Sequence, residues 1–230
     1  MHIGLIGGIG PAATVSYYLR LCARMRQLES PLELTIVQAD LHTLIRNNLG
    51  DRREEQAAVY AALIDRLKAA GAECVGITSL GGHFCFDETV RMSSLPLVSA
   101  VTPLDDYFAG EGITRVGLLG TRVVMRTRLY GQLHRTGAVA CDDDIDRLGQ
   151  LYQDIAVSGS CSSEQRDALF AAGRRMVEEQ GAEAIVLAGT DLNLAFDGHH
   201  DPGYRVIDAL DVHVALLADL ASGRRSLDRV

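Results

Sequence analysis

Two short polar clusters in this chain hold side chains that bind acids or transfer protons. Ser79 and His83 follow one apolar segment, and Thr190 and Asp191 follow another. A hydroxyl donates hydrogen bonds to a carboxylate, an imidazole titrates near neutral pH, and a carboxylate acts as a general acid or base. Cys85 lies two residues beyond His83 and is the cysteine nearest to this cluster. Side chains of these types can bind a carboxylate and can transfer protons.

Each of these residues also has a structural interpretation, which stays open at this point. Ser79, Thr190 and Asp191 can cap the helices that they precede. His83 can lie in a helical turn with its ring bonded to a backbone carbonyl. Cys85 can be a small buried apolar side chain. It acts as a base only if it faces the ligand from the start of a helix.

Two glycine-containing turns follow apolar segments and open expected helices. The first contains Gly8, Ile9 and Gly10, and the second contains Gly120 and Thr121. Free N–H groups at a helix N-terminus bind carboxylates, so we expect these residues, Thr121 included, to contact substrate. The alternative is that glycine serves only to form a tight turn.

Arginines near these turns are candidates for pairing with a carboxylate of the ligand. Arg46 follows the second expected strand, and Arg126 and Arg128 follow the second turn. Their guanidinium groups bind carboxylates through two hydrogen bonds. The run His199-His200-Asp201 suggests a metal site, but adjacent histidines rarely converge on one ion without further ligands. We expect a solvated loop there and no metal ion.

The elements that position these residues alternate between short β-type segments and longer helical patterns. Such alternation predicts an α/β fold with parallel strands joined by right-handed crossovers. We expect strands at 3–7, 34–38, 74–78, 97–101, 115–119, 184–187 and 205–207, and helices at 15–28, 54–70, 126–136, 146–157, 164–180 and 212–221.

The second half of the sequence repeats the first. The segment 3–8 recurs at 116–121, and the triplet Gly-Ala-Glu at 71–73 recurs at 181–183. A duplicated unit predicts two pseudo-symmetric α/β domains with parallel sheets. We expect residues 1–98 plus 208–230 to form the first lobe and 99–207 the second. Ligands bind at the carboxyl ends of strands in open α/β sheets, so we expect the site in the cleft between the lobes.

Composition and charge exclude several classes of protein. The 230 residues are 47% hydrophobic and 23% charged, which is typical of a packed core rather than of a disordered chain. The net charge of −8 and the lack of a basic cluster argue against a nucleic-acid partner. The sequence shows no signal peptide and no apolar run of about 18 residues, so we expect no membrane partner. The five cysteines have no metal or disulfide spacing. We therefore expect a soluble cytoplasmic protein.

The opening turn and several later segments resemble the aspartate/glutamate racemase family, which includes aspartate, glutamate and hydantoin racemases. The resemblance rests on the segment 7–14 with Tyr17 and Tyr18, and on segments 116–121, 181–191 and 206–213. It implies a pair of α/β domains with the active site between them, and a homodimer. It also implies proton transfer next to the carboxylate of a small amino or carboxylic acid, with no cofactor.

The chain departs from this family where two catalytic thiols are expected. Ser79 takes the place of the first thiol and Gly189 that of the second. Asp191 replaces a glutamate of the family, and His83 matches a family histidine. A hydroxyl is a far weaker acid than a thiol, and glycine has no side chain, so the two-thiol mechanism is not supported. An altered set drawn from Ser79, Thr190, Asp191 and His83 would have to replace it.

Three interpretations remain at this point. The first is an isomerase of the racemase type with altered acid and base residues. The second is a non-catalytic homologue that binds a small acid, and the third is a lyase or decarboxylase on the same scaffold. A dinucleotide-binding oxidoreductase is disfavoured, because the first turn lacks the G-x-G-x-x-G pattern and its acidic partner.

Overall fold

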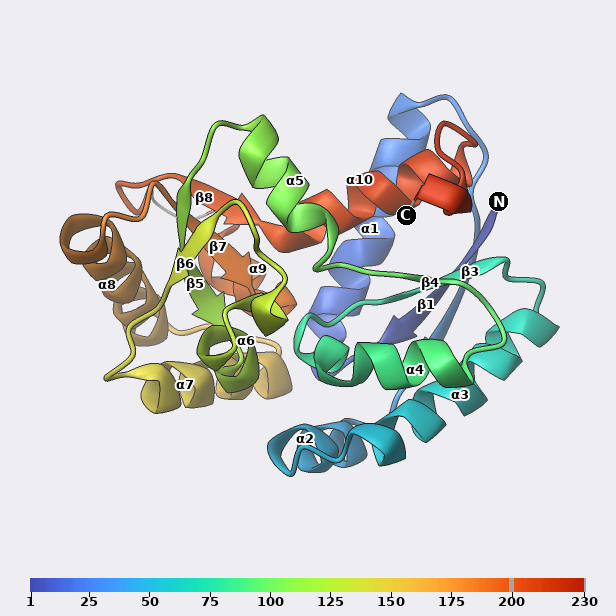
Figure 1. Cartoon of the computed structure of the whole chain (residues 1–230), viewed down its shortest axis with the longest axis horizontal. Coiled ribbons are helices and arrows are strands. Elements are labelled where there is room, and N and C mark those ends of the chain that lie inside the picture. Colours follow the sequence, from blue (N-terminus) through green and yellow to red (C-terminus); the bar gives the residue numbers. More distant parts are fainter. Residues whose placement is uncertain (199–200, 230) are drawn as a thin grey trace. The chain divides into compact units, whose positions relative to one another are not determined.

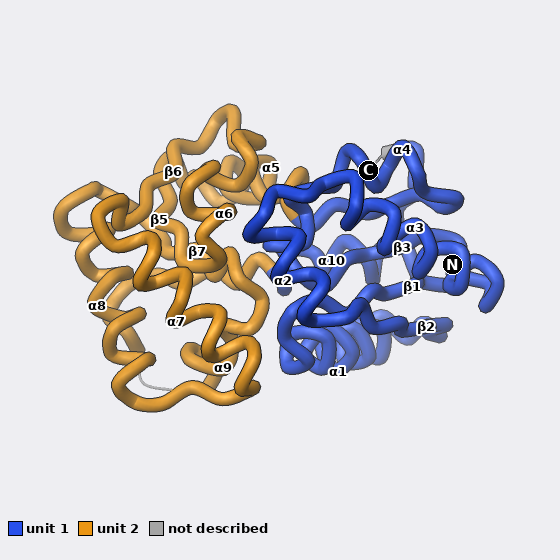
Figure 2. The backbone as a smooth tube through the Cα atoms, turned by 90° about the horizontal axis from the view of Figure 1, so that it is seen from below, with its two compact units in different colours: residues 1–100, 210–230 blue, residues 101–209 orange. Residues whose placement is uncertain are grey.

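The computed structural model describes residues 1–198 and 201–229 and contains two compact units (Figure 1). Unit 1 comprises residues 1–100 and 210–230, and unit 2 comprises residues 101–209, as Figure 2 shows in two colours. Each unit holds one four-stranded sheet. Within the described ranges, no helix combines the length and the apolar composition needed to cross a membrane.

The sheet of unit 1 is parallel throughout, with strand order β2-β1-β3-β4. Its strands are β1 (His2–Gly7), β2 (Glu33–Gln38), β3 (Cys74–Ile77) and β4 (Leu97–Val98). β1 and β3 are almost completely buried, which explains their continuous apolar sequences.

The sheet of unit 2 has the same topology, with strand order β6-β5-β7-β8. Its strands are β5 (Arg115–Gly120), β6 (Gly137–Val139), β7 (Ala184–Ala188) and β8 (Val206–Asp208). The register also agrees: Ile3 pairs with Cys74 in the first sheet, and the repeat-related Val116 pairs with Ala184 in the second. The predicted α/β fold with parallel sheets is confirmed.

The helices of unit 1 cover both faces of its sheet. α1 and α10 lie on one face and α3 and α4 on the other (Figure 1). Pro11 begins α1, where the missing N–H of proline is harmless, and the Asp40 carboxylate accepts a hydrogen bond from Thr43 N at the start of α2. The helical segments are α1 (Pro11–Gln27), α2 (Leu41–Leu49), α3 (Arg53–Ala69), η1 (Gly81–Cys85), α4 (Phe86–Met92), α10 (Ala209–Ala221) and η4 (Leu227–Arg229).

The helices of unit 2 begin and end at residues suited to their positions. Ser162 and Gln165 form a reciprocal capping box at the start of α8, and Gly181 ends this helix in the left-handed conformation. The helical segments are α5 (Pro103–Gly110), α6 (Arg122–Arg126), η2 (Leu129–Gly131), α7 (Ile145–Ser158), α8 (Ser163–Gln180), η3 (Thr190–Leu192) and α9 (Asn193–Phe196).

The helix expected at 126–136 does not form. Arg128, Leu129 and Tyr130 have positive φ values of 52°, 58° and 61°, which end the short helix α6. The Thr127 hydroxyl accepts a hydrogen bond from Tyr130 N and stabilises this turn. Tyr130 and Tyr17 match in the sequence repeat but not in the structure, because Tyr17 lies inside the 17-residue helix α1. The repeat holds for the strands but not for this pair of helices.

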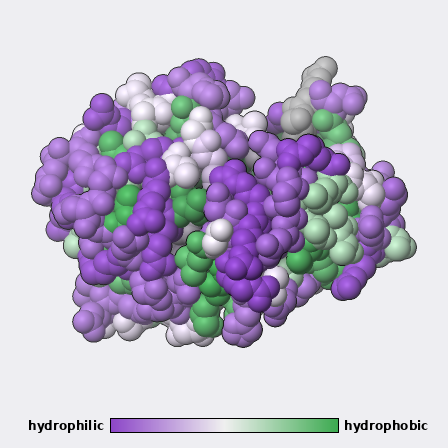
Figure 3. Space-filling model, turned by 60° about the horizontal axis from the view of Figure 1, so that its bottom comes forward, coloured by the Kyte–Doolittle hydropathy of each residue, from purple (hydrophilic) through white to green (hydrophobic). Residues whose placement is uncertain are grey.

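Helix α10 completes the core of the first unit, although it follows β8 of the second. Leu210, Val214 and Leu217 of α10 belong to one buried cluster with residues of β1 and α1. Tyr17 Oη lies 2.8 Å from His213 Nδ1 within this core. The face in Figure 3 is largely hydrophilic, with hydrophobic residues in smaller separate areas.

We expect Leu217→Ala to destabilise unit 1 strongly, because Leu217 is fully buried in this cluster. Truncation of a buried leucine costs about 2–5 kcal/mol, measured as the free energy of unfolding in urea. Leu19→Ala is the matched control, since Leu19 of α1 is 59% exposed, and its effect should stay within about 0.5 kcal/mol. Equal effects of the two substitutions would show that α10 does not stabilise this core.

Candidate functional site

The carboxyl ends of β1 and β3 bring a glycine turn against Ser79. An ideal Cβ on Gly8 would lie 2.5 Å from Ser79 Cβ, so glycine is needed for this close approach. Gln38 of β2 donates to Gly8 O at 2.8 Å and fixes the turn from the other side. Gly10 and Ile9 complete the turn, and Ile9 is 6% exposed. No side chain caps α1 at Gly10.

Ser79 is buried, and its neighbour His83 makes structural hydrogen bonds. The Ser79 hydroxyl accepts a hydrogen bond from Gly82 N at 3.3 Å. Ala100 N donates to His83 Nε2 at 3.0 Å, so the ring proton lies on Nδ1, which donates to Ser79 O at 2.8 Å. Burial lowers the pKa of His83 to about 4. This geometry favours the structural interpretation of His83, because both ring nitrogens are occupied and the ring is neutral at pH 7.

Cys85 does not have the environment of a reactive thiol. Its side chain is fully buried, with Sγ 3.7 Å from the Thr89 hydroxyl. Burial raises the pKa of the thiol to about 12. A thiolate is the reactive form, and this environment disfavours it. Cys85 therefore fits the apolar interpretation and does not replace the thiol missing at Ser79.

The turn after β5 uses its polar side chain to cap a helix. Thr121 is the N-cap of α6, and its hydroxyl accepts a hydrogen bond from Val124 N at 3.4 Å. An ideal Cβ on Gly120 would lie 2.5 Å from Ala188 O, so this glycine allows β5 and the end of β7 to approach. α6 has only five residues. The second turn is therefore a weaker candidate for binding an anion than the first.

The end of β7 forms a buried cluster around Asp191. Gly189 follows the strand, and Thr190 and Asp191 are each 1% exposed in η3. Tyr152 of α7 donates a hydrogen bond from Oη to Asp191 Oδ2 at 3.2 Å. Burial, followed by the charge of Asp191, raises the pKa of Tyr152 well above its usual value. The phenol therefore stays protonated and acts as a hydrogen-bond donor to the carboxylate.

The three candidate arginines have different surroundings. Arg46 is exposed on α2, which follows the carboxyl end of β2, and it forms no ion pair among the described residues. Arg126 is 55% exposed and pairs with Asp146 at 2.5 Å, and Arg128 pairs with Asp142 at 2.6 Å. Arg46 is thus the guanidinium that needs no rearrangement before it binds a carboxylate.

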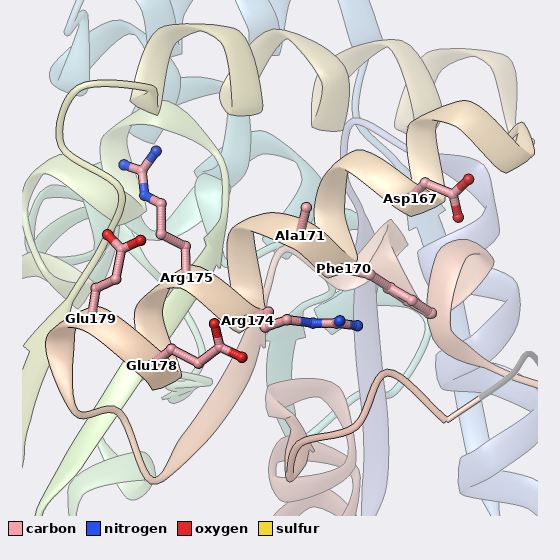
Figure 4. A pocket seen from close by; sticks show the side chains of 7 residues that line it. All are labelled: Asp167, Phe170, Ala171, Arg174, Arg175, Glu178 and Glu179. Carbon is pink, nitrogen blue, oxygen red and sulfur yellow. The ribbon is translucent and has the colours of Figure 1, made fainter.

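A separate groove of about 510 Å³ lies along α8, and no predicted site residue lines it (Figure 4). Arg174 donates to Pro202 O at 3.4 Å, and Arg175 pairs with Asp143. The lining residues all belong to α8: Asp167, Phe170, Ala171, Arg174, Arg175, Glu178 and Glu179. His199 and His200 lie outside the described residues, and the described ones hold no cluster of potential metal ligands.

Two residues that contact the strand ends were not identified as site residues from the sequence. Gln38 reads as the last residue of a strand, and Tyr152 reads as one aromatic residue of an amphipathic helix. Neither the spacing nor the repeat indicates that Gln38 holds the first turn or that Tyr152 contacts Asp191. The sequence signal that bears on Tyr152 is Gly189, a glycine where the family resemblance implies a thiol. Another side chain must fill the volume that the thiol would occupy.

The chain matches the family model described as Asp/Glu/Hydantoin racemase over residues 6–217. An aspartate racemase homologue from Pyrococcus horikoshii is 24% identical, covers 96% of this chain and 99% of its own, and gives a TM-score of 0.77. A proposed Asp/Glu racemase from Yersinia pestis is 26% identical, with the same coverage and a TM-score of 0.78. The aspartate racemase from Picrophilus torridus is 18% identical and covers 97% of this chain and 95% of its own, with a TM-score of 0.75.

We expect the stability of the protein to fall as the pH is lowered from 6.5 to 5. Burial lowers the pKa of His83 to about 4 and that of His213 to about 3, so in this window the unfolded chain binds protons that the native state does not. Each histidine then contributes a slope of up to about 1.4 kcal/mol per pH unit. Urea unfolding at several pH values measures it.

Two single substitutions, one test variant and one control, show whether His83 causes this slope. His83→Gln should flatten the dependence of the unfolding free energy on pH, whereas His42→Gln should leave it unchanged, because His42 is exposed on α2. An unaltered slope in the His83 variant would show that this imidazole is not held neutral by burial.

Proposed function

Because this chain belongs to the Asp/Glu/hydantoin racemase family, we propose that it binds a small amino or carboxylic acid at its strand ends. We propose further that it moves a proton on this acid without a cofactor, using groups other than thiols. The sequence repeat and the family together lead us to propose two lobes, 1–98 with 208–230 and 99–207, in a cytoplasmic homodimer.

The main support is the equivalent placement of Ser79 and Gly189 at the ends of β3 and β7. Both strands pair with their neighbours in the same register, and each end lies against a glycine turn, formed by Gly8 in one unit and by Gly120 in the other. In the first unit, the start of the 17-residue helix α1, where Gly10 supplies no side-chain cap, adds partial positive charge. A carboxylate is the ligand that such a turn favours.

The acid and base groups available to the proposed reaction are few. His83 and Cys85 are held in unreactive forms by burial. The Ser79 hydroxyl is suited to donating a hydrogen bond to a ligand carboxylate, and Thr190 offers a second hydroxyl. Asp191 is the ionisable side chain at the end of β7, with Tyr152 as its donor. We therefore propose Asp191 as the proton-transferring group and the hydroxyls as binding groups.

Two alternative functions need fewer groups for proton transfer than a racemase does. A protein that binds the acid without converting it needs the turns and Arg46 but no free base. A lyase or decarboxylase needs proton transfer to one face of the carbon only, which a single carboxylate can supply. The two alternatives differ from a racemase in whether the configuration of the α-carbon is inverted.

We expect no appreciable racemisation of L-aspartate or L-glutamate, because Ser79 and Gly189 supply no pair of groups with suitable pKa values on opposite faces. Loss of general acid–base catalysis predicts a rate at least about a hundredfold below that of a two-thiol racemase. Chiral chromatography and proton NMR in deuterated buffer measure inversion and exchange at the α-carbon.

Substitutions at the candidate acid and base residues show which group causes any exchange that is measured. Exchange at the α-carbon without inversion, lost in Asp191→Asn and kept in Cys85→Ala, would support one-sided proton transfer by the carboxylate. Rapid inversion of either amino acid would contradict the prediction, and its survival in Ser79→Ala would assign it to another base.

We expect the wild-type protein to bind at least one small mono- or dicarboxylate or amino acid with a millimolar or lower dissociation constant. Arg46→Ala should weaken that binding about tenfold or more, because a charge-assisted hydrogen bond contributes roughly 1.5–3 kcal/mol. Isothermal titration calorimetry against a panel of such acids measures both.

Arg66→Ala is the matched control, since Arg66 is also exposed in the first unit but lies near the end of α3 that leads into the start of β3. The affinity of Arg66→Ala for the acid should equal that of the wild type. Arg126→Ala should weaken binding less than Arg46→Ala does, because Arg126 is already paired with Asp146. Failure of every acid in the panel to bind would exclude the carboxylate site.

A further inference from the structure

Gly189 lacks a side chain for a reason other than its backbone conformation. Its φ of −138° and ψ of 115° are ordinary extended values that any residue adopts. An ideal Cβ at this position, however, would lie 2.8 Å from Cδ2 and 2.9 Å from Cζ of Tyr152, and closer still to Cε2. The aromatic ring therefore occupies the volume that a side chain at residue 189 would need.

Tyr152 is held in this place by packing and by hydrogen bonding. It lies on α7, is 2% exposed, and belongs to the buried face of that helix. Its hydroxyl donates to Asp191 Oδ2 at 3.2 Å. A buried phenol needs such a partner, and the carboxylate of a residue that is itself 1% exposed gains a donor in return.

At the equivalent strand end of the first unit, the strand-end residue keeps its side chain and the neighbouring residue is glycine. Ser79 keeps its side chain at the end of β3, and Gly8 of the neighbouring turn provides the room, since a Cβ there would lie 2.5 Å from Ser79 Cβ. At the end of β7 the strand residue itself is glycine, and a helix side chain enters. One unit thus presents its own strand-end side chain, and the other presents a side chain from α7.

We propose that Tyr152 replaces the side chain absent at residue 189: its ring takes that volume, and its hydroxyl positions the Asp191 carboxylate. Tyr152 is then a positioning residue, and Asp191 the group that meets the ligand. A consequence is that no side chain can be restored at residue 189, a thiol included, unless Tyr152 is also replaced. The role toward a ligand rests on the function proposed above, whereas the packing role does not.

The packing role is tested by thermal unfolding of three alanine variants. Gly189→Ala should lower the melting temperature by about 5 °C or more, because the added methyl group overpacks a buried site. Gly110→Ala is the matched control in the same unit, since a Cβ there meets nothing within 4 Å, and it should shift the melting temperature by less than about 2 °C. In a Tyr152→Leu background, Gly189→Ala should cost less than half as much as in the wild type.

The outcomes of this cycle are separable even when one variant does not fold. A Gly189→Ala protein that fails to fold, while Gly110→Ala and the double variant with Tyr152→Leu do fold, supports the proposal. An unchanged melting temperature of Gly189→Ala, or the same loss with and without the tyrosine, overturns it. None of these measurements depends on a ligand.

The positioning role is tested with Tyr152→Phe, which keeps the ring and removes the hydroxyl. We expect a melting temperature within about 2 °C of the wild type and an affinity for the tightest-binding acid of the panel that falls about threefold or more. Asp191→Asn should also weaken binding, and adding Tyr152→Phe to it should have no further effect, because the phenol acts through the carboxylate.

Tyr204→Phe is the control for this second test. The Tyr204 hydroxyl donates to Phe170 O, so its removal also deletes a partly buried hydrogen bond of unit 2 but touches no strand-end residue. Wild-type affinity in Tyr152→Phe would overturn the positioning role. If no acid binds the wild type, the proposed function fails. The contact between Tyr152 and Asp191 is then tested by the melting temperatures of Tyr152→Phe, Asp191→Asn and their double variant. Strictly additive decreases in melting temperature overturn the contact, and non-additive decreases support it.

Discussion

Parallel pairing of β1 with β3, and of β5 with β7, is the constraint on which the rest of the molecule depends. Parallel strands send their carboxyl ends to one edge of the sheet, and a fixed register decides which residues meet there. Because Ile3 pairs with Cys74 and Val116 with Ala184, Ser79 and Gly189 reach equivalent places. The glycine turns follow from the same pairing, since the strand ends approach too closely for a Cβ.

Close packing beneath these strand ends decides which polar groups remain available for chemistry. A buried polar group needs a hydrogen-bond partner, and in the first unit the backbone supplies both partners of His83. Burial in addition keeps the imidazole neutral and the Cys85 thiol protonated. His83 and Cys85, whose types suggest proton transfer, therefore have structural roles in the first unit. In the second unit, the carboxylate of Asp191 is an ionisable group at the strand end.

The duplicated sheets differ in what covers them. α1 is a long helix that packs Tyr17 into the core, and its counterpart after β5 is the five-residue α6, which left-handed residues end. Helix α10 follows β8 yet completes the core of the first unit. Strand pairing thus preserves the repeat, because every strand residue has a backbone partner, whereas helices diverge because only their apolar face is constrained.

The sequence by itself determined the α/β class, the parallel strands, their repeat and the family, since alternation of apolar segments and glycine turns depends on local spacing. It also showed that residues 79 and 189 lack thiols. Only the tertiary structure decided how neighbouring side chains compensate. His83 bonds to the backbone of Ala100, and Tyr152 fills the volume beside Gly189. Both partners are distant in the chain, and no periodicity encodes which distant side chain enters a vacated volume. Packing in three dimensions settles that choice.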